Sequence, residues 1–173
     1  MLSLNNHPLP HPDCHHWQAA EGWLELGNPV EAAAELEKIA PHLRDYHDVL
    51  QLRYELHARA KRWESALEIV SSLAQQFPTN PNNWIHRSFA LHELKRTLEA
   101  RDLLLPAASK FKQDGLIRYN LACYECQLGN LPAAKQWLAE AFALNPNKEL
   151  KFVALEDPDL EPLRGHIGEL LKK

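Results

Sequence analysis

The sequence repeats itself with a period of thirty-four residues. The stretches "ELGNPVEAAAELEKI" and "QLGNLPAAKQWLAEA" share one layout, and their glycines, Gly27 and Gly129, lie three such periods apart. The two intermediate positions, Lys61 and Lys95, also lie between helix-like segments. A fixed period of this length predicts copies of one small supersecondary unit, each packed on its neighbours.

The apolar positions keep the same register in all four units. Five residues after each of these four points comes an alanine, then a large aliphatic residue four further on, then a third apolar residue three beyond that. These positions are Ala32, Ala66, Ala100 and Ala134, then Leu36, Val70, Leu104 and Leu138, then Ile39, Leu73, Ala107 and Ala141. Glycine is scarce, with 6 in the chain, and the runs rich in Ala, Leu, Glu and Lys hold few β-branched residues. The expected fold class is therefore all-α.

The segments between these helices carry turn signals. In both "LGN" turns the glycine can end a helix in the left-handed conformation, and the asparagine can cap the next one. Pro29 then falls in the first helical turn, where its missing N–H is not needed. In the middle units Lys61-Arg62 and Lys95-Arg96 replace Gly-Asn, and cations suit the negative end of a helix. Each unit should thus be a helical hairpin.

A hairpin repeat of this length resembles the tetratricopeptide repeat. The matching residues in the fourth unit are Leu121, Ala122, Ala134, Leu138 and Pro146, and in the third Trp84, Ser88 and Ala100. The departures are Arg118 at the tryptophan position, Tyr54 at a small-residue position, and Arg44 and Lys112 at proline positions. The resemblance implies a right-handed α-solenoid of four hairpins, with looser packing expected around Tyr54.

The expected organisation has three parts. Residues 1–12 should be an extended or mobile segment, 13–46, 47–80, 81–114 and 115–148 four repeats, and 149–173 a helical cap over the last apolar face. Within the cap we expect a short helix over 148–155, a turn with a helix start at Asp157-Pro158-Asp159, and an amphipathic helix over 160–172. The last helix would place Leu160, Leu163, Ile167 and Leu170 on one side.

In the tetratricopeptide family the first helix of each hairpin lines a concave groove that binds peptides or partner helices. The resemblance places these residues in the groove: Trp17, Glu21, Leu24, Glu25, Gln51, Glu55, Ala58, Arg59, Asn82, Ile85, Phe89, His92, Glu93, Leu116, Tyr119, Cys123, Cys126 and Gln127. The clamp that grips a terminal carboxylate in co-chaperones is absent, because its positions hold Trp17, Glu21, Leu52, Asn82 and His86. The apolar members suit an amphipathic helix or an extended apolar peptide better.

Charge and composition exclude several classes of partner. The formal net charge is -4, so the overall field does not favour nucleic acid or anionic lipid. No apolar stretch approaches the length of a membrane span, and the N-terminal "MLSLNNHPLPHPD" lacks a basic start followed by an apolar run. Three cysteines do not make a disulfide framework. We expect a soluble, cytoplasmic protein with reduced thiols.

Two clusters could bind metal. Cys123 and Cys126 lie on one side of a helix, away from its N-terminus, and the favoured interpretation is that they are small groove residues. The alternative is a zinc site in which they join His92, although a fourth ligand is not evident. The segment "HPLPHPDCHH" would be a loose chelator at best; its candidate ligands are His7, His11, Cys14, His15 and His16.

No catalytic motif is recognisable: G-x-S-x-G, H-E-x-x-H and a phosphate-cradling glycine loop are all missing. The acidic residues around Asp157 fit a turn and a helix start. The expected function is a non-enzymatic scaffold or adaptor that needs no cofactor and binds another protein or a peptide. The alternatives are a metal-binding or thiol-regulated protein using Cys123, Cys126 and His92, or a self-associating homodimer.

Overall fold

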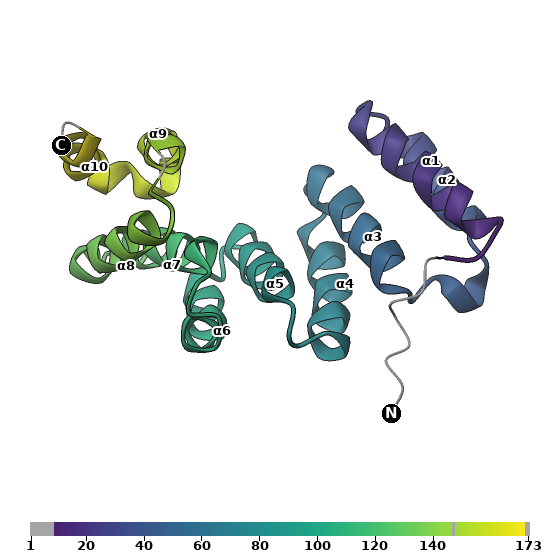
Figure 1. Cartoon of the computed structure of the whole chain (residues 1–173), viewed down its shortest axis with the longest axis horizontal. Coiled ribbons are helices and arrows are strands. Elements are labelled where there is room, and N and C mark those ends of the chain that lie inside the picture. The colour runs from purple at the N-terminus through teal and green to yellow at the C-terminus, as the bar shows by residue number, and fades with distance from the viewer. Residues whose placement is uncertain (1–8, 147, 172–173) are drawn as a thin grey trace. The chain divides into compact units, whose positions relative to one another are not determined.

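The computed structural model describes residues 9–146 and 148–171, and within these ranges it contains helices and no strand (Figure 1). The α-helices are α1 Asp13–Glu25, α2 Pro29–Lys38, α3 His47–Arg59, α4 Trp63–Gln76, α5 Pro81–Glu93, α6 Thr97–Lys110, α7 Gly115–Gln127, α8 Leu131–Leu144, α9 Lys148–Glu156 and α10 Arg164–Leu171. Two 3-10 helices, η1 Pro41–Leu43 and η2 Pro158–Leu163, complete the described part of the chain. The all-α class is confirmed.

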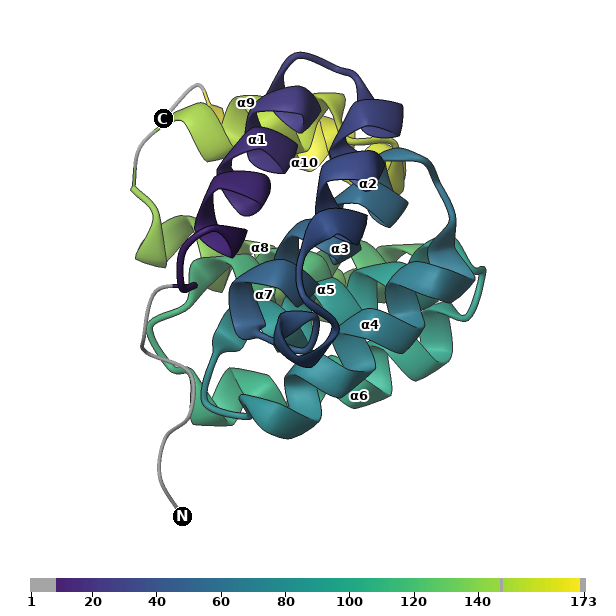
Figure 2. The ribbon, with the colours of Figure 1, turned by 90° about the vertical axis from the view of Figure 1, so that its right-hand side faces the viewer.

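Four hairpins follow one another along the chain: α1 with α2, α3 with α4, α5 with α6, and α7 with α8. The two helices of the first hairpin lie side by side in Figure 2. The first helices begin at Asp13, His47, Pro81 and Gly115, which are thirty-four residues apart. All twelve predicted repeat positions of the second helices and their ends are buried, at most 1% exposed. The helical-repeat prediction is therefore confirmed, while the domain boundaries stay a prediction.

The four hairpin turns have one backbone geometry. Gly27, Lys61, Lys95 and Gly129 all have positive φ, at 76°, 53°, 63° and 81°. At each turn the next residue donates its backbone N–H to a carbonyl five positions back, as Arg96 N does to Leu91 O at 2.9 Å. This is the Schellman pattern that ends a helix. The two lysines therefore occupy a conformation that favours glycine, a stronger constraint than their charge.

The two asparagines of the "LGN" turns behave differently. Asn28 Oδ1 accepts a hydrogen bond from Glu31 N at 3.2 Å, and Pro29 is the first residue of α2, both as predicted. Asn130 holds the N-cap position of α8, but its side chain makes no capping hydrogen bond there, and its Nδ2 donates instead to Glu125 Oε2 at 3.0 Å. Glu125 is buried, and a buried carboxylate needs donors more than an exposed helix end does. The predicted cap at Asn130 is therefore wrong.

The chain divides into two compact units between Phe77 and Pro78. In the first unit, residues of α1, α2 and α3 form one core: Leu9, Ala20, Leu24, Ala32, Leu36, Ile39, Leu43, Val49, Leu52 and Leu56. The buried Asp13 joins the ends of the first hairpin, because its Oδ1 accepts from Ala40 N at 2.6 Å. Tyr54 is buried against Ala66 and Val70 of the second hairpin. Whether Tyr54 loosens the packing stays a prediction.

In the second unit, Trp84 and Arg118 occupy equivalent repeat positions, and both donate hydrogen bonds to backbone carbonyls that precede their helix. Trp84 Nε1 donates to Pro78 O at 3.0 Å in the segment before α5. Arg118, at the same position of the next repeat, is buried and donates to backbone carbonyls before α7. Its three acceptors are Ala108 O, Phe111 O and Asp114 O. Arg118 thus ties the preceding segment to its helix, as Trp84 does one repeat earlier.

The C-terminal helices depart from the prediction in one respect. Residues 148–155 are helical as expected, in α9, but the final helix begins at Arg164 rather than at 160. Pro162 accounts for the difference, because a proline disfavours the α conformation at the residue before it, here Glu161. Residues 158–163 form the 3-10 helix η2 instead. Leu160, Leu163 and Ile167 are buried, as the amphipathic pattern predicts.

Some predictions fall outside the described residues. Residues 1–8, with His7, lie there, and so does the side chain of Leu170. Of the proposed N-terminal segment 1–12, the structure describes only 9–12, and Leu9 is buried in the core of the first unit. Among the helices that are described, none combines the length and apolar character needed to cross a bilayer.

Candidate functional site

In the first unit, the predicted groove residues lie on α1 and α3. Glu21, Glu25, Glu55 and Arg59 are exposed, Trp17, Gln51 and Ala58 are half-buried, and Leu24 is buried. Arg59 donates to Leu24 O at the end of α1 and to the Glu55 carboxylate. Trp17 Nε1 donates to Asp48 O at 3.1 Å. The accessible part of this surface is polar and mainly acidic.

In the second unit, the predicted groove residues lie on α5 and α7, and they are more buried. Asn82, Leu116 and Gln127 are exposed, Phe89 and Glu93 are half-buried, and Ile85, His92, Tyr119, Cys123 and Cys126 are buried. Burial of polar groups on a predicted ligand face raises the question of what covers them.

The chain's own C-terminal segment, Asp157–Leu163, lies against this face. η2 packs against α7, and hydrogen bonds join the two. Tyr119 Oη donates to Asp157 Oδ2 at 2.7 Å, and Cys123 Sγ lies 3.7 Å from the same oxygen. Gln127 Nε2 donates to Asp159 O at 3.0 Å. The segment is thus held by side chains rather than by apolar contact alone.

The fourth interaction comes from the neighbouring hairpin. His92 Nε2, near the end of α5, lies 3.0 Å from Asp159 Oδ2. His92 Nδ1 lies 3.0 Å from Thr97 Oγ1, so both ring nitrogens have a partner. We call His92, Tyr119, Cys123 and Gln127 the aspartate-binding face.

The local sequence explains this arrangement. Tyr119, Cys123 and Gln127 are four residues apart on α7, so they form one stripe along the helix. On the ligand side, Asp157 Oδ1 accepts from Asp159 N at 2.9 Å and caps η2. One carboxylate therefore fixes the turn with one oxygen and receives Tyr119 and Cys123 with the other.

The environment of Tyr119, Cys123 and Cys126 favours their protonated forms. Burial, followed by the nearby Asp157 and Asp159 carboxylates, raises the pKa of the Cys123 thiol well above its usual value. Burial and the same two carboxylates also raise the pKa of Cys126. Burial and the hydrogen bond to Asp157 raise the pKa of Tyr119. Each group consequently remains neutral near pH 7, and Tyr119 and Cys123 can donate to Asp157.

The predicted metal ligands are arranged differently from a metal site. Within residues 9–146 and 148–171, no three His, Cys, Asp or Glu side chains converge in a way that could hold a metal ion. His92 is engaged with Asp159 and Thr97. In the N-terminal cluster, the His11 and His15 rings meet edge to face, and His16 Nδ1 lies 2.9 Å from Glu35 Oε2. Cys14 is half-buried.

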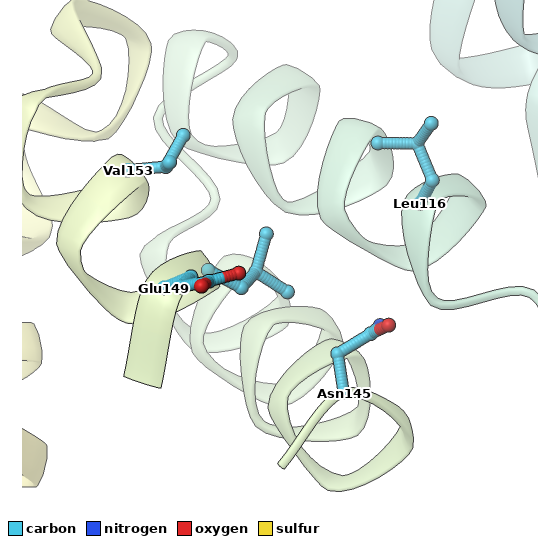
Figure 3. Close-up of a pocket in the computed structure, with 5 residues that line it drawn as sticks. Leu116, Asn145, Glu149 and Val153 are labelled. Atoms are coloured by element: carbon cyan, nitrogen blue, oxygen red, sulfur yellow. The ribbon is translucent and has the colours of Figure 1, made fainter. Parts of the chain in front are cut away.

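A separate pocket of about 270 Å³ is lined by residues of α7, the end of α8 and α9 (Figure 3). Leu116 of α7 and Asn145, next to the end of α8, contribute to it. Glu149, Leu150 and Val153 of α9 supply the remaining lining. Leu116 is the one predicted groove residue in this lining. The pocket is mixed in character and holds no pair of groups arranged for acid–base or nucleophilic chemistry.

Comparison with known proteins supports the fold. No protein-family model matches the chain, and no curated protein is similar to it in sequence. Solved structures of MamA are similar in fold: for MamA MSR-1 the TM-score is 0.67 at 19% identity, covering 78% of this chain and 77% of that chain. For MamA AMB-1 the TM-score is 0.65 at 17% identity, covering 84% and 79%. A MamA mutant gives 0.63 at 19%, covering 76% and 77%. The chain has an all-α helical-repeat fold of the tetratricopeptide type.

Sequence reasoning missed the two residues at the centre of this site, Asp157 and Asp159. Their local pattern fits a turn and a helix start, and that prediction is confirmed by the cap on η2. Their second role is to accept hydrogen bonds from residues that lie far away in the sequence. Asp157 is paired with Tyr119, and Asp159 with His92. The sequence signal that could have indicated this role lies on α7. Tyr119, Cys123 and Gln127 are polar residues predicted to face a groove, and such residues need hydrogen-bond acceptors when they are covered.

Proposed function

We propose that this chain is a non-enzymatic, cytoplasmic protein-interaction scaffold that binds a peptide or a partner helix on the faces of its first helices. The observation that supports this most is the contact between the aspartate-binding face and Asp157–Leu163. There a short segment with two carboxylates and buried leucines is held by side chains of α5 and α7, as a peptide ligand would be.

The first unit offers a second candidate surface, with a different charge character. Its α1 and α3 carry exposed Glu21, Glu25 and Glu55, with Arg59 beside them. An acidic surface of this kind suits a basic or polar segment and sets specificity and association rate more than affinity. Trp17, half-buried beside Asp48, supplies a rigid aromatic edge.

Site-specific photocrosslinking tests this proposal. A photoreactive phenylalanine analogue is placed in the full chain at Glu21 or Glu55 on first helices, and at Glu31 or Glu68, which are also exposed, on second helices as matched controls. We expect one cellular protein to be crosslinked from both first-helix positions and from neither control. Equal crosslinking from all four positions, or crosslinking from the controls alone, would place the interaction elsewhere.

A further inference from the structure

The aspartate-binding face is suited to carboxylates at two fixed points. His92, Tyr119 and Cys123 are only 6%, 7% and 4% exposed, so their polar atoms have little access to water. Buried donors require acceptors, and leaving them unpaired is costly. Here Asp157 satisfies Tyr119 and Cys123, and Asp159 satisfies His92. The segment that occupies this face therefore supplies its acceptors as two carboxylates, two residues apart in the chain.

Apolar anchors follow the two carboxylates. Leu160 and Leu163, in the same segment, are 0% and 1% exposed. In the described part of the chain, the main contact between the C-terminal helices and the repeats runs through η2, whereas α9 and α10 pack mainly on η2 and on each other. The attachment thus has the form of one short linear motif, Asp-x-Asp-Leu, docked on two helices.

We propose that the aspartate-binding face is a receptor for an Asp-x-Asp-Leu segment of another protein, and that residues 157–163 occupy it in cis until that partner displaces them. This inference rests on the proposed function and names the chemistry of one of its partners. Residues 157–163 then compete with the partner for the same face. The partner binds only when its concentration and affinity are high enough to displace them.

A partner protein fits this role better than a second copy of the chain. A second copy offers the same contacts, but its segment has to compete with one that is already tethered, whose effective concentration is on the order of millimolar. Identical contacts at a lower effective concentration do not displace the tethered segment. Displacement needs a partner with contacts that residues 157–163 do not make.

Peptide binding in trans tests the proposal. The probe is a fluorescein-labelled peptide of residues 153–164, titrated by anisotropy into the full chain and into an opened variant, Asp157→Asn with Asp159→Asn. Asparagine keeps the turn cap but loses the charge, so η2 should still form. We expect the opened variant to bind the probe roughly tenfold more tightly than the original chain, because its own segment competes less. Adding Tyr119→Phe to the opened variant should reverse most of that gain.

Two controls keep the test decisive. Glu161→Gln changes an exposed carboxylate of the same segment and should bind the probe like the original chain. A probe with both aspartates replaced by asparagine should bind neither protein. If the opened variant loses helical circular dichroism, Asp157→Asn alone is used with the same criteria.

Equal probe affinity for the opened variant and the original chain, or no binding to either, would overturn the proposal. Light scattering identifies the source of the occupant. A dimer of the original chain that dissociates in the opened variant would overturn the assignment to another protein. Crosslinking from Glu21 and Glu55 is independent of this assay, so failure of the peptide test leaves the scaffold proposal separately testable.

Discussion

Cys123 and Cys126 show how environment determines the chemistry of a residue pattern. Two thiols three residues apart can form a redox pair or half a metal site, and both uses need the thiolate form. Here the thiols are buried, and the carboxylates of Asp157 and Asp159 lie near them. Both influences favour the protonated thiol. In this environment the pair contributes a hydrogen-bond donor, Cys123, and apolar contact.

Cysteine alkylation checks this description. A raised pKa means that the thiolate forms only at a higher pH than usual, and burial restricts access further. At pH 8 we expect iodoacetamide to modify the half-buried Cys14 at least about tenfold faster than Cys123 or Cys126, measured by peptide mass spectrometry. In denaturant the three rates should converge. Modification of Cys123 as fast as Cys14 in the folded protein would contradict the assigned environment.

For individual residues, the sequence predicts position on a helix better than it predicts hydrogen-bond partners. The stripe Tyr119, Cys123 and Gln127 could be placed on one side of a helix from its spacing. Asp157 could be predicted to cap a helix from its neighbours alone. The hydrogen bond between Tyr119 and Asp157 depends on how the chain turns after α8, which no local pattern encodes.

The helical hairpin is the element that the period encodes, and its turn imposes the strictest local condition. Four equivalent positions have positive φ, yet only Gly27 and Gly129 are the residue type that accepts this at little cost. Lys61 and Lys95 adopt the same geometry because the Schellman hydrogen bonds stabilise it. The buried apolar residues of the two flanking helices also fix the positions of those helices. The repeat therefore tolerates local strain at two of its turns.

Exchanging glycine and non-glycine residues at these turns should change the free energy of unfolding in opposite directions. Lys95→Gly should stabilise the protein by about 0.5–1 kcal/mol, because relief of left-handed strain exceeds the entropy that glycine adds to the unfolded chain. Gly129→Ala should destabilise it by about 1 kcal/mol; no atom lies within 4 Å of the added methyl group, so the effect is conformational. Urea unfolding of both variants, with Lys95→Arg as a neutral control, measures this. A destabilised Lys95→Gly variant would contradict the strain argument.

Element boundaries were predictable where the period applies and less so beyond it. The starts of the first helices repeat with the spacing read from the sequence. After α8 the period ends, and the predicted helix over 160–172 begins later because of Pro162. Asn130 likewise binds the buried Glu125 instead of capping α8. Both differences arise where a single residue outweighs the general pattern.

For the molecule as a whole, the fold and the candidate site follow from different kinds of information. Repetition predicts an all-α fold because every unit places the same apolar positions against its neighbours. The proposed function depends on what occupies the faces of the first helices, and the resemblance alone supplied the candidate residues there. In the second unit, four of those residues, His92, Tyr119, Cys123 and Gln127, bind the chain's own segment 157–163, which makes that segment both a structural element and a model for a ligand.

The most direct test of this account is a double-mutant cycle on the contact between Tyr119 and Asp157. The free energy of unfolding is measured by urea titration for Tyr119→Phe, Asp157→Asn, the pair and the original chain. A hydrogen bond to a charged acceptor in a partly buried site predicts a coupling energy of about 1–2 kcal/mol. A coupling near zero, with all four proteins folded, would mean that the segment does not bind this face in solution and would contradict the account.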